Sequence, residues 1–327
     1  MSTRDASPLS TASILHFGRG LLMGCADIIP GVSGGTVALI LGIYERLVTA
    51  ISRVDTTFIG HLTGRRWRDA AAYLDLKFLI PLGIGILAGV AVLGTVMHAL
   101  LEHYLQFTLA AFFGMIGASC YLVGRLIHRW GISEFILLPL GALFAFWLVR
   151  QPALATPPDA QWYIFLCGVI GICAMILPGI SGAFILLIMG KYHDITGIIK
   201  QTLQLELSVA SITTVAVFGT GCVVGLLSFS KLLRWLLAHH GSATMAALCG
   251  FMAGSLYKIW PFQVDTTPEV EEFKHKFFQP VSLTEIPIDG RFWLTILIAI
   301  VAALLVLALD RFAVAPGERV VHDDPEA

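Results

Sequence analysis

Charged residues are scarce in this chain of 327 residues, at 13%, whereas hydrophobic residues make up 57%. Soluble globular proteins carry about a quarter charged residues, so this composition excludes that class and is matched to lipid. The formal net charge is only -1, and no basic cluster is paired with aromatic residues on a polar face. We therefore expect the lipid bilayer, and no nucleic acid, as a partner.

The sequence also lacks the usual spacings for metal and nucleotide sites. Its six cysteines all lie inside apolar segments, and none forms a CxxC pair or a Cys/His ligand spacing. Neither a zinc site nor a disulfide framework is indicated, and the cysteines are expected to act as small apolar residues. A GxxxxGK[ST] loop is missing, so direct drive by ATP is not expected. We predict no cofactor and no metal.

An internal repeat organises the chain. The stretch Cys25–Tyr44 shares 11 identities with Cys173–Tyr192, which lies 148 residues later, and both contain Pro-Gly-x-Ser-Gly. A later series of glycine, histidine, threonine, serine and tyrosine, between residues 83 and 121, recurs after 136 residues. The connection is therefore 12 residues shorter in the second copy. Apolar composition alone does not explain matches that stay in phase over this length.

Each half carries five apolar segments, which we predict to be helices. They lie near 14–29, 35–51, 78–98, 107–126 and 132–149, and near 161–177, 182–199, 207–230, 243–260 and 292–310. Because five is an odd number, the two copies are expected to face opposite ways in the membrane, as inverted repeats do. We predict an all-α polytopic membrane protein whose repeats cover residues 1–150 and 151–327.

The first two segments of each half are predicted to form a re-entrant helical hairpin, over 14–51 in the first copy and 161–199 in the second. A span needs roughly 20 residues, whereas segment 14–29 carries Arg19 and stops at a Pro-Gly break. Irregular backbone at membrane depth is tolerated where protein or a water-filled cavity surrounds it. Two ordinary spans joined by a tight interfacial turn are the alternative, and they leave the parity of the topology unchanged.

Lysine and arginine placement predicts the orientation. With the N-terminus in the cytoplasm, 14 of these residues fall on the cytoplasmic side and 7 on the outer side. Both termini are then cytoplasmic. The long outer connection 261–290 is acidic and is expected to be a solvated cap rather than a binding element.

The two Pro-Gly-x-Ser-Gly tips are candidate anion sites. Proline ends the first half-helix, the glycines permit turn dihedrals, and Ser33 and Ser181 are placed to cap the second half-helices. Those helix starts present backbone N–H groups and the positive end of the dipole. The alternative is that both tips only allow close helix packing. The candidate residues are Pro30, Gly31, Ser33, Gly34, Gly35, Thr36, Pro178, Gly179, Ser181 and Gly182.

Three basic residues near the hairpins are further candidates for binding an anion. Arg19 lies in the first half-helix, Arg46 at the end of the second, and Lys191 near the corresponding end of the second copy. Ionisable residues inside a membrane are costly and often functional. Long basic side chains can instead reach the interface from a turn or two away, and this alternative stays open for all three.

Two carboxylates accompany these basic residues. Asp27 lies three residues before Pro30, and the second copy has Met175 at that position. A carboxylate at this depth is a candidate proton carrier or a partner for Arg19. Glu45 is the acidic residue beside Arg46, and we expect it to line the foot of the hairpin.

The motifs Gly24–Thr36 and Ile176–Gly182 resemble those of the bacterial polyprenyl-phosphate transporter family, with a likeness from about residue 14 to residue 312. The resemblance implies a flippase that returns undecaprenyl phosphate, the lipid carrier for cell-wall polymers, from the outer to the cytoplasmic leaflet of the bacterial inner membrane. It also implies that the phosphate meets the hairpin tips while the polyprenyl tail stays in lipid. Coupling to a proton or sodium gradient is compatible with this function, although no residue requires it.

Two other functions are kept as alternatives. Polyprenyl-pyrophosphate phosphatases have similar hairpins, but their tip resembles Pro-Gly-x-Ser followed by arginine, whereas Ser33 and Ser181 are followed by glycine. The paired glutamates of those enzymes are also missing, and an isolated serine has little to activate it, so we expect no enzyme. A secondary transporter for another anionic solute is the second alternative. Such a carrier should be sealed from lipid, whereas a flippase should open sideways into the bilayer.

Overall fold

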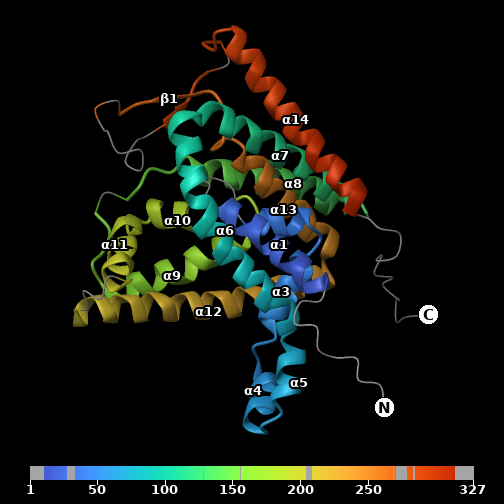
Figure 1. The fold of residues 1–327 in the computed structure, drawn as a ribbon, viewed down its shortest axis with the longest axis vertical. Coiled ribbons are helices and arrows are strands. Elements are labelled where there is room, and N and C mark those ends of the chain that lie inside the picture. Colours follow the sequence, from blue (N-terminus) through green and yellow to red (C-terminus); the bar gives the residue numbers. More distant parts are fainter. Residues whose placement is uncertain are drawn as a thin grey trace.

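The computed structural model describes residues 11–27, 34–127, 129–154, 156–203, 208–267, 269, 278–282 and 284–313, which are almost entirely helical (Figure 1). The helices of the first half are α1 (Thr11–Asp27), α2 (Gly34–Ile40), α3 (Tyr44–Ser52), α4 (Thr56–Thr63), α5 (Trp67–Tyr73), α6 (Leu76–His103), α7 (Leu105–Arg125) and α8 (Ile132–Val149). Those of the second are α9 (Gln161–Ile176), α10 (Gly182–Ile188), α11 (Tyr192–Leu203), α12 (Val209–His239), α13 (Gly241–Ser255) and α14 (Gly290–Ala313).

Four helices in the described part of the chain are long and apolar enough to cross a membrane: α7, α8, α12 and residues Gly290–Ala308 of α14. A fifth span is added if α5 and the first part of α6, which meet at a bend of 65°, count as one. Helix α9 is apolar but shorter. The chain is therefore an all-α, multi-pass membrane protein. Each of the predicted apolar segments overlaps at least one of the observed helices.

The second arm of each predicted hairpin is not one helix but two, and that part of the prediction is wrong. Helix α2 ends before Gly42, whose φ is +65°, and α10 ends before Gly190, whose φ is +69°. In both turns the glycine N–H and the next N–H bond back to helix carbonyls, which is the Schellman arrangement. A left-handed glycine thus terminates the helix at the same repeat position in both halves.

Helix pairs recur between the halves at the offsets of the sequence repeat. Helix α1 packs along α6, and α9 packs along α12. A Cβ placed on Gly85 would lie 2.2 Å from the carbonyl oxygen of Phe17, and one on Gly221 would lie 2.2 Å from that of Phe165. These contacts require glycine, because the helix backbones touch there. Gly85 and Gly89, with their counterparts Gly221 and Gly225, therefore mark repeated helix–helix contacts.

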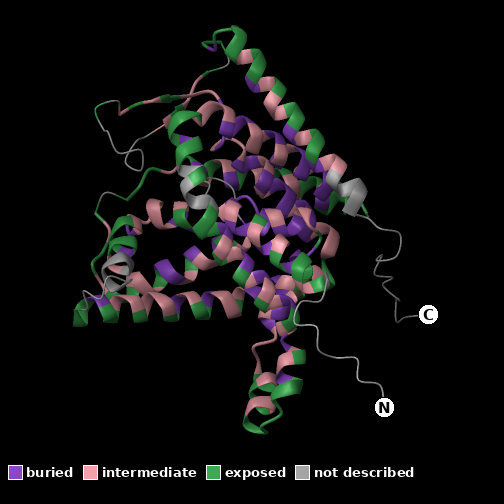
Figure 2. Ribbon diagram, in the orientation of Figure 1, coloured by how far each residue is buried: buried purple, intermediate pink, exposed green. Residues whose placement is uncertain are grey.

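The last two helices of each half are exchanged between the halves. Helix α7 packs on α14, and α8 packs on α13. A Cβ on Gly114 would lie 1.9 Å from the carbonyl oxygen of Ala299, and one on Gly250 would lie 2.2 Å from that of Leu138. Buried residues concentrate in a central cluster to which α1, α2, α7 and α13 contribute, while α14 keeps a largely exposed outer side (Figure 2). The core therefore belongs to both halves together.

Helices α4 and α5 form a hairpin that projects from the body (Figure 1) and that the sequence did not predict. Asp55 begins α4 by accepting a hydrogen bond from the Phe58 N–H at 3.0 Å, and it also accepts one from the Tyr73 hydroxyl at 2.8 Å. Burial acts to raise the pKa of Asp55, but these hydrogen bonds outweigh it and hold the pKa below its ordinary value. The Asp55 side chain therefore caps the start of α4, a short helix that has no apolar pattern in its sequence.

The connection between α13 and α14 contains two short strands. Strand β1 (Gln263–Asp265) pairs antiparallel with β2 (Phe278–Pro280), and Val264 lies opposite Gln279. Glu271 and Glu272, two of the acidic residues on which the predicted solvated cap depends, lie outside the described residues.

Candidate functional site

The first hairpin break is closed by Asp27. Its carboxylate Oδ1 accepts a hydrogen bond from the Gly34 N–H at 2.6 Å, which links the end of α1 to the start of α2. A Cβ on Gly34 would lie 2.8 Å from Oδ2 of Asp27, so the carboxylate needs a glycine there. The expected tip residues Pro30, Gly31 and Ser33 lie outside the described residues.

The second break, between α9 and α10, is buried in protein. Pro178 and Gly179 are both buried, and Gly179 has a φ of +86°. A Cβ on Gly179 would lie 2.8 Å from the Cα of Met252 and 2.9 Å from the Oγ of Ser255, so only glycine fits against α13. Ser181 lies directly before α10, but its side chain makes no capping hydrogen bond, in contrast to the expected serine cap.

The residues that flank the two breaks are arranged alike but differ in chemistry. Met175 occupies the position of Asp27 in the second copy, and its Cγ would lie 2.4 Å from a Cβ on Gly182. In each half, the glycine that begins the helix after the break therefore lies against the side chain seven residues before it. In the first half that side chain is a carboxylate, and in the second it is a thioether with no charge.

A buried hydrogen bond joins the two hairpins. The Gly179 N–H in the second break donates to Oγ1 of Thr36 in α2 at 2.8 Å, and Thr36 is fully buried. The Tyr44 hydroxyl, at the start of α3, donates to the carbonyl oxygen of Ile176 at 3.0 Å. Two of the predicted site residues, Thr36 and Gly179, are thus in direct contact although 143 positions separate them.

Arg46 lies at the foot of the first hairpin, in α3. Its Nε donates to Oδ2 of Asp75 at 2.7 Å, and its Nη2 donates to Oδ1 at 3.2 Å. The guanidinium also lies over the ring of Phe78, 4.4 Å from the centroid. Glu45, its neighbour, is exposed. The charge of Arg46 is therefore balanced by a carboxylate at this site.

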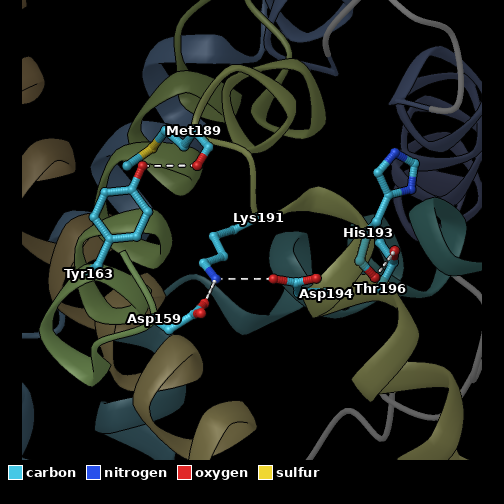
Figure 3. A network of polar contacts seen from close by, with 7 residues as sticks. All are labelled: Asp159, Tyr163, Met189, Lys191, His193, Asp194 and Thr196. Carbon is cyan, nitrogen blue, oxygen red and sulfur yellow. Dashed lines mark hydrogen bonds and ion pairs between the residues drawn. The ribbon is translucent and has the colours of Figure 1, made fainter. Parts of the chain in front are cut away.

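Lys191 lies at the corresponding foot of the second hairpin, directly after Gly190. Its ammonium is buried and donates to the carboxylates of Asp159 and Asp194, the latter at 3.1 Å (Figure 3). The Tyr163 hydroxyl donates to the carbonyl oxygen of Met189 at 2.9 Å beside it. These contacts fasten the turn between α10 and α11 to α9 and to the segment before it.

The environment of Arg19 includes a histidine that the motifs did not indicate. Arg19 lies in α1, about 12 Å along the helix axis from Asp27. One turn before it, His16 is buried, and its Nδ1 has no hydrogen-bond partner among the described residues. The His16 ring lies edge-on against Phe78 at 5.0 Å between centroids, and Arg46 covers the same ring. The foot of the first hairpin therefore brings together the side chains of His16 and Arg19 from α1 and of Arg46 from α3.

Among the residues that the structure describes, two further cations contact aromatic rings and no carboxylate. The Lys258 ammonium lies 4.8 Å from the ring centroid of Phe184, and the Arg150 guanidinium lies 5.3 Å from Phe146 and 5.8 Å from Tyr257. The hairpin motifs do not include them, because both residues lie outside the two predicted hairpins. Among the described residues, no group of three or more histidines, cysteines or carboxylates could hold a metal ion.

Comparison with known proteins gives the family. A family model described as undecaprenyl phosphate translocase-like matches residues 23–277. The chain is 36% identical over 303 residues to a polyprenyl-phosphate transporter of Vibrio cholerae, covering 90% of this chain and 95% of that protein. It is 30% identical over 254 residues to a polyprenyl-phosphate transporter of Staphylococcus aureus, covering 74% and 84% respectively. No solved structure matches the chain. A family match that includes both hairpin breaks, together with relatives aligned over most of their length, places this chain in the undecaprenyl phosphate translocase-like family.

Proposed function

We propose that this chain is a flippase that returns undecaprenyl phosphate from the outer to the cytoplasmic leaflet of the bacterial inner membrane, where it serves cell-envelope polymer synthesis. The observation that carries the proposal is the relation to two polyprenyl-phosphate transporters, the first at 36% identity over 90% of the chain. The multi-pass helical architecture supports it, because a lipid carrier needs a path through the bilayer.

The proposed architecture is a pair of inverted repeats, residues 1–150 and 151–327, each opening with a re-entrant hairpin. Helix contacts that recur at offsets of 148 and 136 residues support the repeat. The exchange of α7 and α8 with α14 and α13 is reciprocal, as expected when a two-fold axis relates the halves. The short helices α1, α2, α9 and α10 on either side of the two breaks support the re-entrant arrangement.

The proposed phosphate site is the junction of the two breaks, with Arg19 as the basic residue on the cytoplasmic approach. Support comes from the hydrogen bond between Gly179 and Thr36, because this contact joins elements of both halves. A movement of one half against the other must open or close it, which is what alternating access requires. The remaining tip residues, Pro30, Gly31, Ser33, Gly34, Gly35, Pro178, Ser181 and Gly182, are proposed to line this junction.

Asp27 is proposed as the carrier of a coupling proton. Its carboxylate already holds the Gly34 N–H at 2.6 Å, where a lipid phosphate would otherwise compete for the same donor. Two anions at one donor repel each other, so protonation of Asp27 favours phosphate entry. Sodium remains the alternative coupling ion. The proposed orientation of the chain in the membrane has both termini in the cytoplasm.

A leaflet-specific assay in proteoliposomes tests the function. Wild-type protein is expected to move undecaprenyl phosphate without releasing inorganic phosphate, and Arg19→Ala or Ser33→Leu should lose at least about 10-fold in rate. Arg129→Ala, which removes an exposed arginine between α7 and α8, is the matched control and should transport normally.

The outcomes separate the alternatives. Phosphate released from undecaprenyl pyrophosphate would mean a phosphatase. Folded protein that moves no lipid under either ion gradient, but transports another anion, would mean a solute carrier. Normal transport by Ser33→Leu would show that the breaks are not the site.

A further inference from the structure

Three cations close to the hairpins, Arg46, Lys191 and Lys258, differ in the groups that they contact. Arg46 and Lys191 are paired with carboxylates, so an incoming phosphate would have to compete with a resident anion. Lys258 is half-buried, yet no carboxylate pairs with it in the part of the chain that the structure describes. Its ammonium instead lies over the ring of Phe184 at 4.8 Å. A partly desolvated ammonium with no counter-ion is costly, and an aromatic face offsets only part of that cost.

The position of Lys258 connects it with the second break. Phe184 lies in α10, two residues after Gly182, at the repeat position that Thr36 occupies in the first half. Ser255, one turn before Lys258, lies against Gly179. Phe184, which lies under the ammonium, and Ser255, whose carbonyl accepts the Lys258 backbone N–H at 2.9 Å, therefore connect the lysine with the elements of the hairpin junction.

Lys258 also breaks the symmetry between the halves. The residue at the same repeat position in the first half is Leu122, which is buried in an apolar cluster with Ala118 and Val306. The preceding tyrosine is present in both copies, as Tyr121 and Tyr257. One half thus carries a positive charge where the other carries an apolar side chain.

We propose that Lys258 binds the phosphate of the lipid headgroup beside the second break. An ammonium over a ring keeps its N–H donors available, and charge-assisted hydrogen bonds to phosphate are among the strong ones. Phosphate supplies the missing counter-ion, and Phe184 holds the side chain of Lys258 at the junction while the site is empty. This inference rests on the proposed function, since it assumes a polyprenyl phosphate as the substrate.

Binding of labelled undecaprenyl phosphate to the full chain in nanodiscs tests the proposal, with undecaprenol as the uncharged competitor. Lys258→Leu, which copies the residue of the first half, should weaken binding of the phosphate form roughly 10- to 100-fold and leave binding of the alcohol unchanged. Lys258→Arg should stay within about 3-fold of wild type, because it keeps the charge. Arg125→Gln is the control, since Arg125 contacts Tyr121 at the equivalent helix end of the other half.

Each result decides a different part of the proposal. Equal binding by wild type and Lys258→Leu, with unchanged thermal unfolding, would overturn the role of Lys258 and leave the proposed function intact. Wild type that binds undecaprenol as tightly as the phosphate form would overturn both. Inorganic phosphate that displaces the lipid at matched concentration would keep Lys258 as an anion ligand but overturn the lipid as its source.

Discussion

At the scale of single residues, Thr36 carries the contact between the two hairpins. It is fully buried, and its hydroxyl oxygen is the acceptor for a backbone N–H from the other half of the chain. Valine has nearly the same shape but offers no acceptor. The position therefore separates the contribution of the hydrogen bond from that of packing.

Thr36→Val should destabilise the protein by about 1–3 kcal/mol, because the Gly179 N–H would stay buried without a partner. Thr36→Ser keeps the acceptor and should lose less. Both are measured by denaturant unfolding in detergent micelles. Equal stability of the two variants would show that the hydrogen bond contributes nothing.

The closure of the first break shows where residue-level prediction stops. The sequence predicted serine caps, and at Ser181 the structure has none. The Gly34 N–H at the start of α2 donates instead to the carboxylate of Asp27, which lies seven residues earlier on the other side of the break. Capping rules describe a residue directly before the helix, so they do not include a carboxylate that returns from the preceding helix.

At the scale of elements, glycine spacing decides which helix faces touch. Gly219 and Gly221 both lie in α12, yet only Gly221 faces α9, where a Cβ would lie 2.2 Å from the carbonyl oxygen of Phe165. Nothing lies within 4 Å of a Cβ on Gly219. The two positions differ in tertiary contact while sharing one helix, which makes them a matched pair.

Gly221→Ala should destabilise the protein by roughly 1–3 kcal/mol, because α9 and α12 must move apart to admit a methyl group. Gly219→Ala should be neutral or stabilising by up to about 1 kcal/mol, since alanine favours the helix. Thermal unfolding of both variants in the same detergent measures the difference. A larger loss at Gly219 would contradict the contact.

Element boundaries were predictable at the two Pro-Gly breaks, where α1 and α9 end close to the predicted residues 29 and 177. Gly42 and Gly190 belong to the shared motif, but apolar residues continue on both sides of each glycine. Hydropathy therefore predicted one segment where the structure has two helices. Helices α4 and α5 were missed because they are 8 and 7 residues long and have no long apolar run. Lys258 was not predicted because it lies far along the chain from both hairpin motifs, and its contact with Phe184 forms only in the fold.

At the scale of the whole molecule, neither half can bury its own surfaces. Helices α7 and α8 have their main partners in α14 and α13, and the largest core cluster includes residues of both halves, among them Met23 and Met252. The proposed units 1–150 and 151–327 are therefore sequence repeats and not domains that fold alone.

Fragments 1–150 and 151–327, expressed separately, should fail to accumulate, because the glycine faces of α7 and α13 would lack their partners. Expressed together, they should assemble into a complex that survives purification in mild detergent. Co-purification through a tag on one fragment measures this. A single fragment that accumulates alone and unfolds cooperatively would contradict the exchange of helices.

The pairing of α7 with α14 also sets an order of events during synthesis. Helix α7 ends at residue 125 and its partner begins at residue 290, so the ribosome must add the whole intervening stretch first. At translation rates of about 5–20 residues per second, this wait lasts on the order of 10–30 s. Throughout that interval the close-packing face around Gly114 meets lipid or the insertion machinery instead of Ala299. The nascent chain is thus committed to the membrane well before its fold can close.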